Sequence, residues 1–200
     1  GADLRLSNIE QADFRNADLD GADLSQATLT GADFRQASLN GANLSKTDLH
    51  RVNFQAADLE GANLECAYMN ETNLTDAKID PRWLLVADLA TNGGAGKQLQ
   101  ESSLEGSNLI GVDLSNANLA SINFSNADLS GANLAGANLE SVDFTGAKLD
   151  RANLKGAQLR FAKLHKGWLR ETSLVEADLS EADLTEADLR GADLSNASLK

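Results

Sequence analysis

Apolar side chains recur at every fifth position along the whole chain. Of the 40 positions 4, 9, 14 and so on to 199, 39 carry Leu, Phe, Ile or Met, and Gly94 is the exception. We call this position the repeat centre. Two residues before it the side chain is small, most often Ala, and immediately before it the side chain is usually Asp or Asn. The consensus is therefore Ala-(Asp/Asn)-Leu followed by two variable residues, as in Ala22-Asp23-Leu24.

A period of five is incompatible with one long helix or one long strand. Five residues of an α-helix rotate by about 500°, so the apolar stripe would spiral around the axis. In a continuous strand an odd period sends successive centres to opposite faces. Within one repeat, however, the small residue and the centre share a side. We therefore predict a short extended segment and a turn in each repeat, with a φ > 0 position that suits residues such as Gly21.

The spacing of unusual residues predicts how many repeats form one coil. Aromatic centres recur at every fourth repeat within two sets, namely Phe14, Phe34 and Phe54, and then Phe124 and Phe144. Lys replaces the usual Asp or Asn at three positions that each follow an Asp by four repeats: Lys78, Lys148 and Lys163. Stacked rings and opposite charges stabilise neighbouring strands. We therefore predict coils of four repeats each.

This pattern resembles the pentapeptide-repeat family over nearly the whole chain. The resemblance implies an all-β fold, a right-handed quadrilateral parallel β-helix, with about nine to ten coils in a chain of this length. The four-sided coil follows from the spacing of the residues, whereas the handedness comes from the resemblance alone. We expect one solenoid over 1–200, with repeat blocks at 1–80 and 97–200 separated by a helical insertion and loop at 81–96.

The insertion carries the signals of a short helix. Asp80 is a favourable N-cap, the only Pro follows it at the first helical position, and Asn-Gly-Gly follows Thr91. We predict a helix at about 81–91. The segment resembles the Asp-Pro-(Lys/Arg)-Trp insertions of cyanobacterial members of the family. It either covers the solenoid and joins the two blocks, or it protrudes and binds a partner through Trp83 and Leu84.

Composition argues against several classes of function. The chain has one Cys, two His and a net charge of −13, and it contains no long apolar run. These features disfavour a disulfide scaffold, zinc binding, membrane insertion and direct nucleic-acid binding. His50 and His165 follow different centres far apart in sequence, so no catalytic constellation is visible. We expect no enzyme activity, no cofactor and no metal site.

Charge is distributed unevenly near the end of the chain. Residues 148–170 carry seven basic residues and one acidic residue, and residues 171–194 carry eight acidic residues and one basic residue. We call the first group the basic belt; its members are Lys148, Arg151, Lys155, Arg160, Lys163, Lys166 and Arg170. Either the two coils neutralise each other, or the belt orients an acidic partner. Trp168 stands where Asp or Asn is usual, so Trp168, Lys155, Arg160, Lys166 and Arg170 are candidate partner-binding residues.

These observations favour a non-enzymatic rigid rod that mediates protein–protein interaction with an unidentified protein partner. Two alternatives stay open: a DNA-mimicking inhibitor or protector of DNA gyrase, as a resemblance to quinolone-resistance members of the family would allow, and a structural spacer in a larger protein. Half of the acidic residues are the Asp before a centre, so the repeat itself explains the net charge.

The two ends of the sequence both fall inside a repeat. Neither end shows a polar cap, so we expect further sequence beyond them or end-to-end self-association through uncapped coils. The expected compartment is the cytoplasm, or the thylakoid lumen or periplasm if a signal peptide has been removed.

Overall fold

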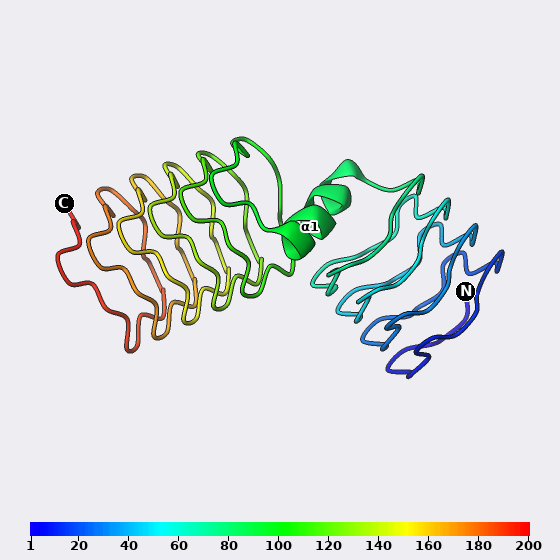
Figure 1. The fold of residues 1–200 in the computed structure, drawn as a ribbon. Helices are drawn as coiled ribbons and strands as arrows, with labels where there is room; N and C mark the ends of the chain where they lie inside the picture. Colours follow the sequence, from blue (N-terminus) through cyan, green and yellow to red (C-terminus); the bar gives the residue numbers. More distant parts are fainter. The chain divides into compact units, whose positions relative to one another are not determined.

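The computed structural model describes residues 1–200. The chain divides into two compact units, Gly1–Thr91 (unit 1) and Asn92–Lys200 (unit 2), each of which is described by itself. Within each unit the chain winds through successive coils (Figure 1). One helix, α1 (Pro81–Asn92), is the only regular element, since strand pairing is confined to isolated single-residue bridges.

In both units one coil contains four repeats, as predicted. Parallel bridges join each pre-centre residue to its counterpart four repeats later, from Asp3↔Asp23 in unit 1 to Asp178↔Ser198 in unit 2. Backbone hydrogen bonds follow the same register; for example, Leu24 donates its N–H to the carbonyl of Asn43 at 2.8 Å. Neighbouring coils are therefore held together by main-chain bonds on every side.

A side-chain bond at each turn explains why the residue before the centre is Asp or Asn. The Oδ1 atom of Asp23 accepts the backbone N–H of Ser25 at 3.0 Å, and this pattern recurs along the chain. Asp and Asn share this acceptor, so the repeat accepts either residue. The backbone N–H of Ala27 then bonds to the carbonyl of Leu24 at 3.1 Å and closes the turn.

Outside α1, the second residue after each centre has a left-handed conformation, and many of these residues are not Gly. Gly21 has φ 61°, as the sequence predicts, but Gln26 has φ 59° and the bulky Phe161 also has φ 59°. Left-handed φ values are uncommon for residues with a Cβ. The hydrogen bonds between coils hold the corner in place, so the turn does not require Gly.

The core of each unit consists of the small residues and the centres. Ala22 and Leu24 are both 0% exposed, and the aromatic centres stack in the predicted columns. Ring centroids are 4.7 Å apart for Phe14 and Phe34, and 5.4 Å apart for Phe124 and Phe144.

The three Lys residues that follow an Asp by four repeats form the predicted ion pairs. The distances from Lys Nζ to Asp Oδ2 are 2.8 Å for Lys78–Asp58, 3.1 Å for Lys148–Asp128 and 3.2 Å for Lys163–Asp143. The spacing of charges in the sequence therefore reports contacts between coils.

Helix α1 begins where the sequence predicts and ends one residue later. The carboxylate of Asp80 accepts the N–H of Arg82 at 2.9 Å, which confirms it as the N-cap. Trp83 is buried, together with Val86, Ala87 and Leu89. At the other end the hydroxyl oxygen of Thr91 accepts the backbone N–H of Glu71 at 2.9 Å. The helix thus satisfies a backbone donor of the preceding coil in unit 1.

Candidate interaction surface

Five members of the basic belt form ion pairs with neighbouring coils. Lys148 and Lys163 bind the preceding coil. Arg151 Nε lies 2.9 Å from Glu171 Oε2, and Lys166 Nζ lies 4.0 Å from Glu186 Oε2. Arg170 donates to Asp150 through its Nε atom at 3.1 Å and through its backbone N–H at 3.0 Å. Local neutralisation therefore accounts for most of the belt.

Lys155 and Arg160 are the exposed members of the belt that form no ion pair. Lys155 precedes and Arg160 follows the side of the coil that contains Gln158. The Arg160 guanidinium carbon lies 5.2 Å from the centroid of the Phe161 ring. Phe161 is itself 41% exposed. These residues keep cationic and aromatic groups available on a different side of the coil from Trp168.

Trp168 projects from the side of the coil between Lys166 and Arg170. Its side chain is 46% exposed, and the Arg170 guanidinium carbon lies 4.7 Å from the ring centroid. Arg170 is in turn held by Asp150. The ion pair with Asp150 holds the Arg170 guanidinium, and the cation–π contact with that guanidinium holds the indole in one orientation. Part of the indole remains accessible to solvent.

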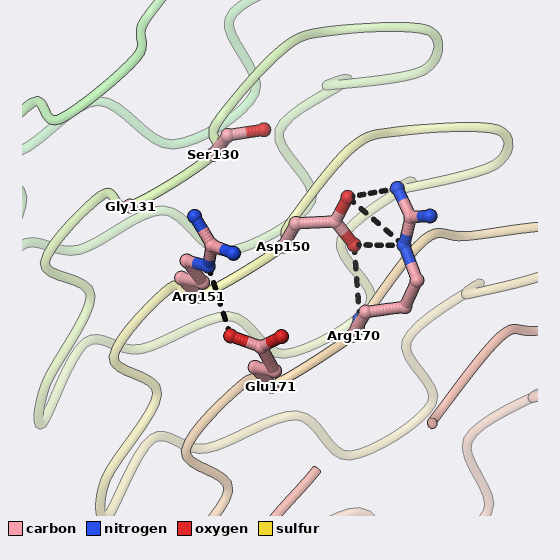
Figure 2. Close-up of a pocket in the computed structure, with 6 residues that line it drawn as sticks. All are labelled: Ser130, Gly131, Asp150, Arg151, Arg170 and Glu171. Carbon is pink, nitrogen blue, oxygen red and sulfur yellow. Dashed lines mark hydrogen bonds and ion pairs between the residues drawn. The ribbon is translucent and has the colours of Figure 1, made fainter. Parts of the chain in front are cut away.

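A cavity of about 570 Å³ lies at the next corner of these coils. Figure 2 shows the residues that line it, with the Arg151 guanidinium on the side of Arg151 that faces Ser130 and Gly131. Gly131 lines the cavity, and no atom lies within 4 Å of the position that a Cβ would occupy there. The Arg170 guanidinium lowers the pKa of Asp150, so this lining carboxylate stays ionised.

The candidate residues on α1 fall into two groups. Leu84 is 43% exposed and can contact a partner. Trp83 is 1% exposed, so its side chain is not presented at the surface as a partner contact requires. The Arg82 guanidinium carbon lies 4.4 Å from the centroid of its ring. Trp83 is one of four buried residues of the helix, together with Val86, Ala87 and Leu89.

The predicted site residues do not form one patch. Trp168, Lys166 and Arg170 lie on one side of a coil in unit 2, Lys155 and Arg160 lie on another, and Leu84 belongs to unit 1. The sequence reading did not single out Gly131, Ser130 and Glu171 as cavity-lining residues. Writing the sequence in rows of four repeats would have placed Gly131, Arg151 and Glu171 in one column.

No group of three or more His, Cys, Asp or Glu side chains could hold a metal ion. Cys66 is half-buried at a left-handed corner, and His50 lies near Tyr68 with ring centroids 6.1 Å apart. The single helix, α1, is not long and apolar enough to cross a membrane.

Comparison with known proteins places these features in a family context. The family model described as pentapeptide repeats matches eight copies, at residues 1–36, 17–55, 53–80, 98–136, 107–146, 122–160, 137–174 and 169–200. Among curated proteins, none matches the chain significantly.

Three solved structures illustrate the range of similarity. The pentapeptide repeat protein Rfr23 of the cyanobacterium Cyanothece 51142 is 28% identical, with a TM-score of 0.50, and the match covers 52% of this chain and 86% of that chain. HetL of the cyanobacterium Nostoc sp. strain PCC 7120, which is involved in heterocyst differentiation regulation, is 29% identical over 100% of this chain and 87% of that chain, with a TM-score of 0.36. QnrB1, a plasmid-mediated fluoroquinolone resistance protein, is 14% identical over 99% of this chain and 84% of that chain, with a TM-score of 0.39.

Proposed function

We propose, from the premise that this chain belongs to the pentapeptide-repeat family, that it is a non-enzymatic protein whose rigid solenoid mediates protein–protein interaction. We further propose that its coils are right-handed and four-sided, and that blocks 1–80 and 97–200 act as one solenoid joined by the insertion.

The observation that carries this proposal is the accessible indole of Trp168 on a rigid backbone. Trp is enriched among the residues that dominate binding energy at protein interfaces. The Trp168 backbone N–H bonds to the carbonyl of Ala147 at 2.9 Å, so the residue is fixed between coils. A side chain that is already ordered loses little conformational freedom on binding.

The chemistry of the surface supports a binding role over a catalytic one. Catalysis needs a nucleophile or base whose pKa is tuned by a pocket. The shifted carboxylates here have pKa values that are lowered, because Arg, Lys, Ser or backbone donors bind them; Asp113, for example, accepts the N–H of Ser115. Such groups remain ionised at neutral pH and serve the turns and the ion pairs.

The test is affinity capture with matched variants. Wild-type protein should retain a specific protein from a lysate of its native cells, and Trp168→Ala should reduce that capture at least about tenfold, which is a typical effect for an interface hot spot. Ile110→Ala is the control, since Ile110 is also an exposed apolar residue of unit 2, at 54% exposure. Equal capture by wild type and Trp168→Ala would remove the support for this proposal.

A further inference from the structure

The two units carry the same arrangement of side chains at positions separated by five coil lengths of sequence. In each unit an exposed aromatic residue stands in place of Asp or Asn, an Arg–Glu ion pair occupies the next corner, and a Gly precedes the Arg by one coil. In unit 1 these residues are Tyr68, Arg51, Glu71 and Gly31, and in unit 2 they are Trp168, Arg151, Glu171 and Gly131. We call each set an aromatic–arginine corner.

The ion pairs of the two corners have the same geometry. The distance from Arg Nε to Glu Oε2 is 2.7 Å for Arg51–Glu71 and 2.9 Å for Arg151–Glu171. The Arg side chains are 65% and 75% exposed, respectively. In each pair the hydrogen bond to Glu uses Nε. Figure 2 shows the terminal nitrogens of Arg151 on the side away from Glu171, toward the cavity. The end of the guanidinium is therefore available to a ligand.

The Gly residues keep the approach to each guanidinium open. Gly31 has φ 69° and Gly131 has φ 68°, and neither would place a Cβ within 3.4 Å of another residue. At Gly31 the nearest atom to the Cβ position is Cγ of Gln11 at 3.6 Å, whereas at Gly131 no atom lies within 4 Å. In unit 2, Gly131 and Arg151 both line the cavity of about 570 Å³.

Each aromatic ring is supported from the neighbouring corner. Tyr68 is 40% exposed and its ring centroid lies 6.1 Å from that of His50. Trp168 is 46% exposed and lies beneath Arg170. The supporting residues differ, but in both units the exposed aromatic residue stands three residues before the Glu that binds the Arg.

We propose that each unit uses its aromatic–arginine corner to bind an acidic segment of a protein partner, so that one chain takes two equivalent segments. The segment places a carboxylate against the terminal nitrogens of the Arg and its neighbouring apolar side chain on the aromatic ring. This inference rests on the proposed function, because it specifies the chemistry of the partner.

Charge complementarity selects an acidic segment. Guanidinium groups bind carboxylates through two parallel N–H donors, and such bonds are stronger than neutral hydrogen bonds. A basic segment would be repelled by the exposed Arg of each corner. The nearest carboxylates, Glu71 and Glu171, already bind Arg51 and Arg151, respectively. An aromatic surface beside the Arg adds apolar contact area that a carboxylate alone would not use.

The composition of the chain makes the two corners separately observable. Tyr68 is the only Tyr, and Trp168 and the buried Trp83 are the only Trp residues. Protein labelled with fluorotyrosine and fluorotryptophan therefore gives one ¹⁹F signal for each corner and one internal control. The probe is the peptide acetyl-Gly-Glu-Leu-Gly-amide, and the control peptide has Gln in place of Glu.

The expected result is a saturable shift of the Tyr68 and Trp168 signals with the Glu peptide, and no shift of the Trp83 signal. The Gln peptide should bind at least about fivefold more weakly, because the charge-assisted bond is lost. Arg51→Gln should remove the response at Tyr68 alone, and Arg151→Gln the response at Trp168 alone. Arg190→Gln is the matched control, since this exposed Arg of unit 2 binds Asp188 away from the cavity lining.

Three outcomes would overturn the inference: equal binding of the Glu and Gln peptides, a response at one corner only, or responses that survive both Arg→Gln substitutions. Circular dichroism checks that each variant is folded, which is expected because both Arg side chains are exposed. Affinity capture that depends on Trp168 but not on Arg51 or Arg151 would leave the proposed function standing while the acidic-segment inference fails.

Discussion

Thr47 donates its hydroxyl hydrogen to the carbonyl oxygen of Leu44 across 2.5 Å in the interior of unit 1. Ser107 occupies the same repeat position in unit 2, where its hydroxyl is fully buried and makes no hydrogen bond. Both residues replace the consensus Ala. One polar substitution is therefore satisfied by the turn, whereas the other leaves a buried polar group without a partner.

We expect Ser107→Ala to raise the free energy of unfolding by about 1 kcal/mol, because it removes an unsatisfied buried hydroxyl. Thr47→Ala should lower it by about 1 to 2 kcal/mol, because it removes a satisfied hydroxyl and a packed methyl group. Denaturation in guanidinium chloride measures both changes. A destabilising effect of Ser107→Ala would show that its hydroxyl has a partner in solution.

Replacement of Asp80 tests the start of α1. Asp80→Ala should cost about 1 kcal/mol of stability, because the N–H of Arg82 loses its acceptor at 2.9 Å. Asp80→Ser should retain most of the stability, since Ser is an equally favourable N-cap. Fluorescence of the buried Trp83 follows the loss of the helix during denaturation. Equal stability of the Ala and Ser variants would contradict a capping role.

In the Phe column of unit 1, we expect replacement of Phe34 by Leu to cost little stability and replacement by Ala to cost much more. Phe34 is 0% exposed and lies 4.7 Å from Phe14 and 5.2 Å from Phe54, measured between ring centroids. Phe34→Ala should cost about 3 to 5 kcal/mol. Phe34→Leu should cost less than about 1.5 kcal/mol, because Leu fills this position in most repeats. Thermal denaturation of the two variants gives the comparison, and similar losses for both would argue against this packing.

The stability of the solenoid should fall as the pH drops below about 4. Three carboxylates have a pKa of about 2, because each accepts hydrogen bonds from the guanidinium two residues later: Asp3, Asp13 and Asp188. A lowered pKa stabilises the folded state above the unfolded-state value of about 3.9, and this contribution is lost as the pH falls towards 2.

Asp188→Asn isolates one of these contributions. The Asn side chain keeps the oxygen that accepts the N–H of Arg190 at 3.2 Å, but it removes the titrating charge. We therefore expect a smaller difference in the denaturation midpoint between pH 6 and pH 2.5 than in the wild type. An unchanged acid sensitivity would show that this pair contributes nothing to the pH dependence.

Gyrase inhibition separates the interaction hypothesis from DNA mimicry. We expect no inhibition of gyrase supercoiling at micromolar protein, because Lys and Arg neutralise several of the acidic columns, as in Lys148–Asp128 and Arg170–Asp150. A duplex presents an uninterrupted row of negative charges. Inhibition at this concentration, reduced by substitution of the remaining surface acids, would favour the mimic.

The coil period could be predicted because unusual residues report their neighbours. Phe34 reveals the column of Phe14, and Lys148 reveals its contact with Asp128, since the members of each pair are four repeats apart. The burial of Trp83 could not be predicted in the same way, because α1 departs from the repeat. The cavity is lined by residues of successive coils, such as Gly131, Arg151 and Glu171, so it emerges from the sequence only when whole coils are aligned and not from the single repeat.

The left-handed corners were anticipated only in part. Gly at this position indicates a turn, but Phe161 adopts the same backbone conformation with φ 59°. The conformation is imposed by the bonds to the adjacent coils, such as that from the Phe161 N–H to the carbonyl of Ser180 at 3.1 Å. The conformational preference of a single residue cannot predict a left-handed φ that is imposed by hydrogen bonds between stacked coils.

The backbone hydrogen bonds between coils also determine how each unit should respond to mechanical force. They connect one coil to the next, so tension on the ends of a unit loads the bonds of the outermost coil first. The chain should therefore unravel coil by coil at low force. Each step releases the four repeats of one coil, or about 70 Å of extended chain. Such a unit behaves as an extensible tether under load, although it is stiff at rest.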